Sequence, residues 1–167
     1  MNQLSNKIQV PIKTKIALII MFLVGLVITT SGISTFIFFS QQANIQSEQI
    51  EKSWQDCPGC PGPPSVDYES RLRVLRVTII PLGLLALIGA AVSFLWKKQA
   101  WKMGVITAAL FEILSIPIIS GILSNLSSTP APGIIIVSLP SVLVFIALIL
   151  LLSDRKNYFA AIDNWKK

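Results

Sequence analysis

Histidine is absent from this chain, and cysteine occurs only twice among its 167 residues. Without histidine, the chain lacks the side chain that most often serves as a general base at neutral pH, and a Ser-His-Asp hydrolase is excluded. Two cysteines supply only half of a usual zinc site, so we expect no bound metal and no cofactor. Charged residues make up 13% of the chain, against about 25% in soluble domains. A large water-soluble domain is therefore excluded.

Four long apolar stretches are the main positive feature, and they cover residues 16–39, 77–96, 103–123 and 133–152. Each is close to the ~20 residues that a helix needs to cross a hydrocarbon layer of about 30 Å. They lack the alternation of apolar and polar residues that marks membrane β-strands. Since lipid cannot satisfy open strand edges, the sequence predicts an all-α integral membrane protein with four transmembrane helices.

The segments between these stretches differ in length. Two of them, 97–102 and 124–132, are short and predict that the last three spans are neighbours in an antiparallel bundle. Residues 40–76 form a 37-residue first outer loop. Residues 1–15 precede the first span, and residues 153–167 form a short amphipathic tail that could lie on the membrane surface. The apolar face of this tail consists of Tyr158, Phe159, Ile162 and Trp165.

Orientation follows from the basic residues. Of the 14 Lys and Arg residues, ten lie within 1–15, 97–102 and 153–167, and four lie within 40–76. Because basic residues are retained on the cytoplasmic side, both termini are expected in the cytoplasm. The first apolar stretch is longer than the 7–15 residues of a signal core, so we expect an uncleaved span.

The net charge of +6 comes from basic residues beside the apolar stretches, where anionic lipid headgroups attract them. We therefore expect the lipid bilayer of a cytoplasmic or plasma membrane as the partner, and no nucleic acid. Other membrane-protein subunits are a further candidate class of partner.

Glu112 is the one ionisable residue deep inside an apolar stretch. An intramembrane acid is a functional hypothesis by default, since an ionised carboxylate there is costly. Its helical neighbours Ala108, Ala109 and Ser115 are small, which predicts that this face turns toward another helix. Three polar residues of other spans are expected at a similar depth, namely Thr29, Thr30 and Ser141.

Three roles are open for Glu112. No Lys, Arg or His lies at its depth, so we expect a largely protonated carboxyl that donates a hydrogen bond to a Ser or Thr oxygen. Alternatively, it contacts a partner in another subunit, or it belongs to an ion or proton pathway.

Cys57 and Cys60 form a C-x-x-C pair in the predicted outer loop. In an oxidising compartment such a pair closes a small disulfide loop. The alternative is a redox pair that exchanges electrons with partner thiols, which requires an accessible sulfur of lowered pKa. Pro61 follows Cys60, so this is not a haem attachment site.

The sequence thus favours a small multi-pass membrane protein without an evident catalytic centre, acting as a structural, accessory or interaction component. Two alternatives belong to other classes. One is a membrane thiol-disulfide oxidoreductase that uses Cys57 and Cys60, and the other is an ion or proton pathway that uses Glu112.

Overall fold

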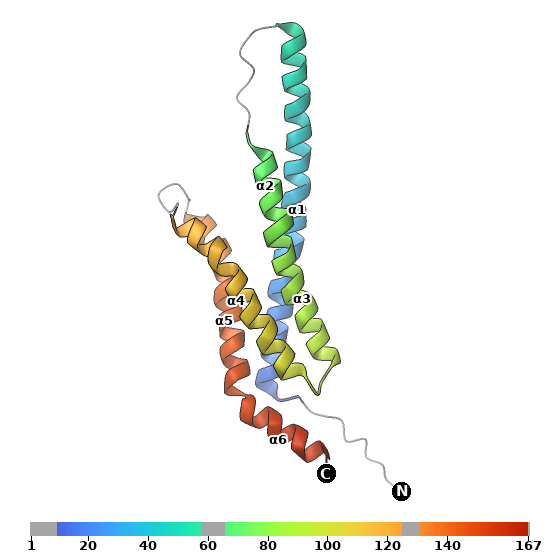
Figure 1. The fold of residues 1–167 in the computed structure, drawn as a ribbon, viewed down its shortest axis with the longest axis vertical. Helices are drawn as coiled ribbons and strands as arrows, with labels where there is room; N and C mark the ends of the chain where they lie inside the picture. The colour runs from blue at the N-terminus through green and yellow to red at the C-terminus, as the bar shows by residue number, and fades with distance from the viewer. Residues whose placement is uncertain (1–9, 58–65, 125–130, 167) are drawn as a thin grey trace. The chain divides into compact units, whose positions relative to one another are not determined.

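The computed structural model describes residues 10–57, 66–124 and 131–166. Within these ranges all regular structure is helical (Figure 1), as the sequence predicts. The elements in chain order are α1 (Ile12–Asp56), α2 (Tyr68–Val74), the π-helical turn η1 (Leu75–Ile79), α3 (Ile80–Leu95), α4 (Ala100–Ser124), α5 (Ala131–Ser153) and α6 (Arg155–Lys166).

Three helical stretches are long and apolar enough to cross a membrane, and they cover Ile12–Gln55, Tyr68–Leu95 and Ala100–Ser120. A fourth candidate is a bent pair, Ser138–Ser153 with Arg155–Asp163, which turns by 49° at the break between its two helices. Each of the four apolar stretches in the sequence therefore falls on a helix. The chain has three or four candidate spans.

The segment 40–76 differs from the expected loop, because most of its described part is helical. Helix α1 continues to Asp56, and α2 begins at Tyr68. The physical reason lies in residues 41–55, which are rich in Gln, include Glu and Lys, and contain no Gly or Pro to interrupt a helix. The helix breakers of this segment are confined to positions 58–64.

The chain divides into two compact units, one formed by Met1–Val27 with Leu82–Lys167 and the other by Ile28–Pro81. We call them the first and the second unit. The first contains the start of α1 together with most of α3 and all of α4, α5 and α6. The second contains the rest of α1 together with α2 and η1.

In the first unit, α4 and α5 pack against each other and run antiparallel. The Trp101 side chain on α4 donates a hydrogen bond to the Leu151 carbonyl on α5, with 2.5 Å between Nε1 and the oxygen. Further along, Glu112 of α4 meets Ser141 of α5. From the first contact to the second, the residue number rises along α4 and falls along α5. The two helices are therefore antiparallel neighbours, as the short connection predicts.

Small residues mark the places where the helices of the first unit come closest. At Gly25 of α1, the nearest atoms of α3 are the Leu87 nitrogen and the Gly83 oxygen. At Gly89 of α3, the Thr107 side chain of α4 occupies the space that a Cβ would take. A helix that is apolar on every side has no single hydrophobic face to direct its packing. Small residues that allow close backbone approach therefore determine which faces of these helices are in contact.

In the second unit, three kinds of contact hold the C-terminal part of α1 against α2 and the residues just before it. The ring of Phe39 lies 6.0 Å from that of Tyr68, centroid to centroid. The Arg71 guanidinium stands 5.6 Å from the centre of the Phe39 ring, an attractive cation–π geometry. Gln46 Oε1 accepts a hydrogen bond from the Val66 amide at 3.2 Å. These contacts join the two sides of the segment that the sequence suggested as a loop.

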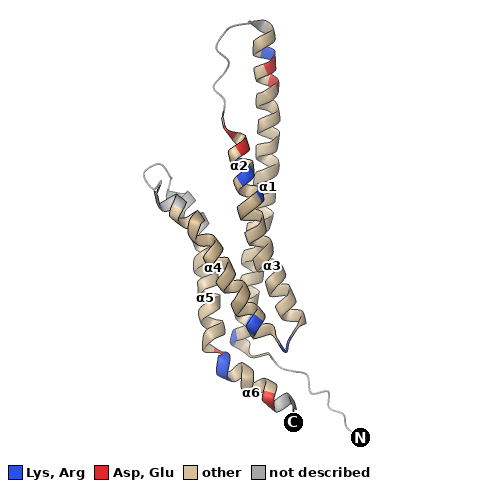
Figure 2. Ribbon diagram, in the orientation of Figure 1, with Lys and Arg blue, Asp and Glu red and all other residues tan. Residues whose placement is uncertain are grey.

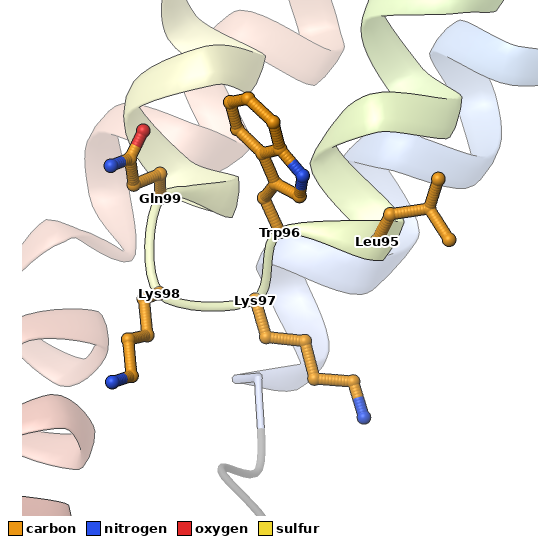
Figure 3. A pocket seen from close by; sticks show the side chains of 5 residues that line it. All are labelled: Leu95, Trp96, Lys97, Lys98 and Gln99. Atoms are coloured by element: carbon orange, nitrogen blue, oxygen red, sulfur yellow. The ribbon is translucent and has the colours of Figure 1, made fainter.

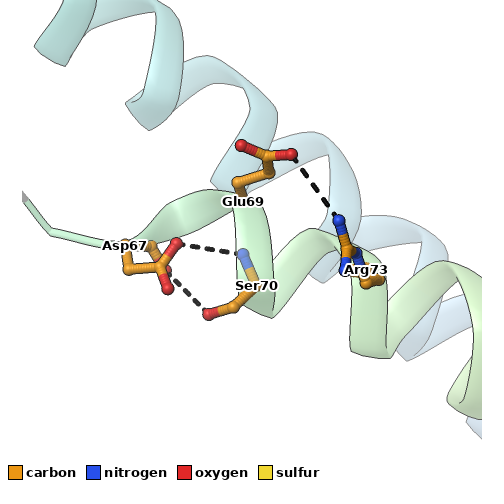
Figure 4. Close-up of polar contacts among 4 residues, drawn as sticks. All are labelled: Asp67, Glu69, Ser70 and Arg73. Carbon is orange, nitrogen blue, oxygen red and sulfur yellow. Dashed lines mark hydrogen bonds and ion pairs between the residues drawn. The ribbon is translucent and has the colours of Figure 1, made fainter.

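The start of α2 is capped by Asp67 (Figure 4). Its Oδ1 accepts a hydrogen bond from the Ser70 amide at 3.1 Å, which satisfies one of the free donors at a helix start. The same bond stabilises the ionised carboxylate and lowers the pKa of Asp67. Glu69 and Arg73 form an exposed ion pair at 3.9 Å, and such surface pairs contribute little stability.

The π-helical turn η1 lies immediately before a proline. The Ile80 amide donates to the Leu75 carbonyl, five residues earlier, and Pro81 has no amide hydrogen to continue the ladder. A wider turn accommodates the proline ring without ending the helix. Pro117 and Pro140 lie inside α4 and α5.

Replacement of Gly25 by alanine should test the close approach of α1 and α3. A Cβ at Gly25 would lie 2.5 Å from the Leu87 nitrogen, a backbone atom that cannot move alone. We expect Gly25→Ala to lower the thermal stability of the detergent-purified protein by roughly 1–3 kcal/mol, the usual cost of overpacking. Gly32→Ala is the matched control, because the nearest atom there is Cγ1 of the Ile80 side chain at 3.1 Å and no backbone atom comes as close. Equal losses in both variants would contradict the prediction.

Candidate functional site

Glu112 lies on α4 and reaches across to α5. The Ser141 hydroxyl donates a hydrogen bond to Glu112 Oε2 at 2.7 Å. The structure therefore brings together two of the four residues that the sequence placed at one depth. The contact is local to the packed pair of α4 and α5, and it uses the face of α4 that carries the small residues Ala108 and Ser115, both buried.

Ser115 adds a third oxygen-bearing side chain to this contact. Its hydroxyl donates to the Glu112 carbonyl at 2.8 Å and lies 3.4 Å from the Ser141 hydroxyl. Only 5% of Ser115 is exposed. The sequence indicated Ser115 as a small packing residue, and the structure shows that its hydroxyl also takes part in a polar contact. We call Glu112, Ser115 and Ser141 the carboxyl–hydroxyl cluster.

One atom of the carboxyl–hydroxyl cluster has no partner. Glu112 Oε1 is buried and forms no hydrogen bond with any residue that the structure describes. A buried polar atom without a partner costs about 1–3 kcal/mol, and more when it is charged. The cost at Glu112 Oε1 therefore depends on whether the carboxyl is ionised or protonated.

The carboxyl–hydroxyl cluster is chemically simple, since it contains one carboxyl and two hydroxyls. A serine nucleophile needs an adjacent base and donors for the developing oxyanion, and no imidazole exists in this chain. Among the described residues, no group of three or more His, Cys, Asp or Glu side chains gathers to hold a metal ion. The groups present in the cluster can exchange hydrogen bonds with one another, and its carboxyl can bind a proton.

Thr29 and Thr30 belong to the second unit, whereas Glu112 belongs to the first. Thr29 is 9% exposed, and its hydroxyl oxygen has no hydrogen-bond partner within the described part of the chain. Thr30 is exposed. A polar layer that joins these threonines to Glu112 stays a prediction.

Cys57 follows the last turn of α1 directly, and its amide donates to the Ser53 carbonyl at 3.1 Å. Its side chain is exposed. Cys60 lies outside the described residues. The disulfide and the redox alternative for this pair both stay predictions.

Asp154 is a buried acid that sequence reasoning did not single out. It is 1% exposed, and its carboxylate accepts three hydrogen bonds. Two reach Oδ2 from Thr14, at 3.0 Å from the amide and 2.8 Å from the hydroxyl. The third reaches Oδ1 from the Asn157 amide group at 3.0 Å. The carboxylate is thus well satisfied, although it is almost completely removed from solvent.

The Asp154 contacts involve the starts of two helices. Thr14 lies in the first turn of α1, where backbone amides lack partners and a negative charge is favourable. Asp154 also precedes α6, and its carbonyl accepts from the Tyr158 amide at 2.9 Å. An Asp just before a helix is a recognisable capping signal in the sequence. Nothing in the sequence pairs it with Thr14, which lies 140 positions away.

Helix α6 uses its apolar face to pack within the first unit. Tyr158 is 1% exposed and lies in a buried cluster with Leu18 and Ala100. Its hydroxyl donates to the Lys97 carbonyl at 2.6 Å. The ring of Trp101 lies 5.6 Å from that of Phe159 in an edge-on arrangement. The tail therefore packs against the rest of the first unit through Tyr158 and Phe159, and its position at a membrane surface stays a prediction.

The turn between α3 and α4 carries an open pocket of about 520 Å³ (Figure 3). It is lined by Leu95, Trp96, Lys97, Lys98 and Gln99. The Lys97 and Lys98 side chains extend to one side of the turn, away from the helices, whereas Trp96 and Gln99 extend to the other. The pocket combines cationic and apolar groups and contains no acid.

Basic residues of the first unit gather at one of its ends (Figure 2). The contact of Thr14 with Asp154 places the start of α1 beside the junction of α5 and α6. The contact of Tyr158 with Lys97 places the turn between α3 and α4 at the same end. The described parts of the three segments that the sequence assigned to the cytoplasm thus meet at one end of this unit.

Comparison with family models, with curated proteins and with solved structures gives no match for this chain.

Substitution of Asp154 should test the joint between α1, α5 and α6. Asp154→Ala would leave the Thr14 amide and hydroxyl buried without an acceptor, so we expect a loss of about 1–3 kcal/mol in the free energy of unfolding. Thermal unfolding of the purified protein measures it. Asp163→Ala is the matched control, because Asp163 is an exposed acid on α6. If both substitutions had the same small effect, the joint would not contribute to stability.

Proposed function

We propose that the protein is an integral membrane protein that acts as a structural, accessory or interaction component, with both termini in the cytoplasm. The observation that carries this proposal is the apolar surface of the packed α4–α5 pair. Large apolar side chains on the outer faces of both helices are about half exposed, among them Ile106, Ile113, Ile116, Val142, Phe145 and Ile149.

Lipid is the solvent that suits such a surface. Soluble monomers rarely expose contiguous apolar patches larger than a few hundred Å². In a bilayer the same side chains need no cover, and helices associate through small residues and hydrogen bonds. The close approaches at Gly25 and Gly89 and the bond between Ser141 and Glu112 are contacts of this type.

The basic end of the first unit supports the cytoplasmic position of both termini. Lys13, Lys97, Lys102 and Arg155 belong to the segments that meet there. The Arg155 guanidinium stands 6.0 Å from the centre of the Trp101 ring. Lys and Arg are retained on the cytoplasmic side, and Trp and Tyr prefer the boundary between lipid and water.

An accessory role agrees with the chemistry of the candidate site. The carboxyl–hydroxyl cluster contains no histidine and no second carboxyl, and the outer faces of α4 and α5 expose large apolar side chains. A neighbouring membrane helix could dock on such a face without burying any unpaired charge.

Membrane topology provides the first test. In a variant with Cys57 and Cys60 replaced by serine, a single cysteine is placed at Ser47 on α1 or at Gln99 in the α3–α4 turn. We expect a membrane-impermeant maleimide to label the first site in intact cells and the second only after the membrane is opened, because the basic turn faces the cytoplasm. The reverse pattern would contradict the orientation. Release of the protein by alkaline carbonate would contradict membrane insertion.

Partner capture provides the second test. A photoreactive amino acid at Ile113, which is 61% exposed on α4, should crosslink to one stoichiometric membrane protein that is also retained in mild detergent. The same residue at the buried position Ala108 is the matched control and should crosslink only within the chain. Recovery of the chain alone, with crosslinks to lipid only, would argue against an accessory role.

A further inference from the structure

The Glu112 carboxyl has no ionisable neighbour to balance its charge. Helices α3 and α5 contain no ionisable side chain, and Lys102 is the only other one on α4. Lys102 lies about 15 Å away along the axis at ~1.5 Å per residue. Lys13 and Lys15 lie in the first turns of α1, at the end marked by the Asp154 contact. None of these described side chains therefore lies close enough to balance the charge of an ionised Glu112.

The ionised state fits the observed geometry poorly. The Ser141 hydroxyl satisfies Oε2, but Oε1 has no donor among the described residues. Ser115 cannot supply one, because its proton is directed to the Glu112 carbonyl. In the ionised state, Oε1 would share the negative charge while buried without a hydrogen bond, which costs several kcal/mol.

The protonated state fits the same distances with every hydroxyl used. A proton on Oε2 donates to Ser141 over 2.7 Å, since either oxygen of an O–H···O pair can be the donor. Ser141 then donates to Ser115 over 3.4 Å, and Ser115 donates to the Glu112 carbonyl over 2.8 Å. Oε1 remains as a neutral carbonyl oxygen, whose lack of a donor costs much less than that of a charged one.

We propose that Glu112, Ser115 and Ser141 form an intramembrane proton-binding site, in which the carboxyl holds one proton at neutral pH and the two hydroxyls complete a directed hydrogen-bond chain. The chain links both sides of the α4–α5 contact, so proton binding and helix packing are coupled. A divalent cation is disfavoured because Mg²⁺ and Ca²⁺ take about six or more oxygen ligands. The inference goes beyond an accessory role, although it rests on α4 crossing the membrane.

An apolar carbodiimide, dicyclohexylcarbodiimide, tests the site by a reaction that needs the protonated acid. The acid's proton passes to a carbodiimide nitrogen while a carboxyl oxygen bonds to the central carbon. The acyl group then moves to nitrogen and leaves a stable N-acylurea, so the reaction is an addition without a leaving group. The full-length protein in liposomes is treated across a pH series, and the modified residue is identified by peptide mass spectrometry.

We expect modification at Glu112 at neutral pH and its decline under alkaline conditions. Glu112→Gln should abolish the modification at this position. The water-soluble carbodiimide EDC should not reach Glu112 in the same liposomes.

Three results would overturn the proposal, and they can be told apart. Absence of modification from acidic to neutral pH, with EDC also excluded, would show a buried but unprotonated carboxyl and leave membrane insertion intact. Protection by sodium but not by choline at equal ionic strength would make a metal ion the occupant. Modification by EDC would place Glu112 in water and would also contradict the span assigned to α4.

Thermal stability supplies a readout that is independent of labelling. Wild-type protein should lose stability as the pH rises from neutral to alkaline, because deprotonation leaves a buried charge without a donor, whereas Glu112→Gln should not show this loss. Ser141→Ala should lower the melting temperature at neutral pH. Ser120→Ala is the control, since Ser120 is an exposed hydroxyl on α4 that bonds only its own helix at Pro117. Parallel pH profiles of wild type and Glu112→Gln would contradict the site.

Discussion

The packing of the first unit depends on the hydrogen bonds of the buried residue Asp154, which connect the start of α1 with the junction of α5 and α6. Its bonds to Thr14 hold the beginning of α1, and its own backbone begins α6 directly after α5. A helix start leaves amides that need an acceptor, and Thr14 is buried, so a protein group has to provide one. One side chain meets this need for α1, and the same residue fixes the corner from which Tyr158 reaches the α3–α4 turn.

Two acids on neighbouring helices are treated in opposite ways by their surroundings. Asp154 receives three hydrogen bonds from Thr14 and Asn157, beside the basic end of the unit, where a negative charge is supported. Glu112 receives one from Ser141 and keeps an oxygen without a partner. The two acids thus differ in how many hydrogen-bond donors their surroundings supply, and a buried carboxyl is well satisfied only where donors reach both of its oxygens. The carboxyl of Asp154 thus has a structural role, whereas the carboxyl of Glu112 is the one that we propose binds a proton.

The sequence predicts the long apolar helices well because continuous apolarity over about 20 residues is a strong signal that can be read from the sequence alone. It also places Ser141 near Glu112, since depth along a span follows from counting residues. Two features escaped prediction for identifiable reasons. Residues 40–56 were expected in a loop because they are mostly polar. They are helical because those polar residues have good helix propensity. The pairing of Thr14 with Asp154 depends on tertiary packing, which no local pattern records.

The polar part of α1 changes what the segment between the first two spans can do. In the proposed topology, α1 leaves the lipid near Phe39 and continues for several turns that carry Glu48 and Glu51. A single helix of this length is marginal in water. Contacts of Phe39 with Tyr68 and of Gln46 with Val66 provide the tertiary support that it lacks alone. In the proposed topology these contacts hold the polar part of α1 and the start of α2 together as a pair of helices outside the membrane.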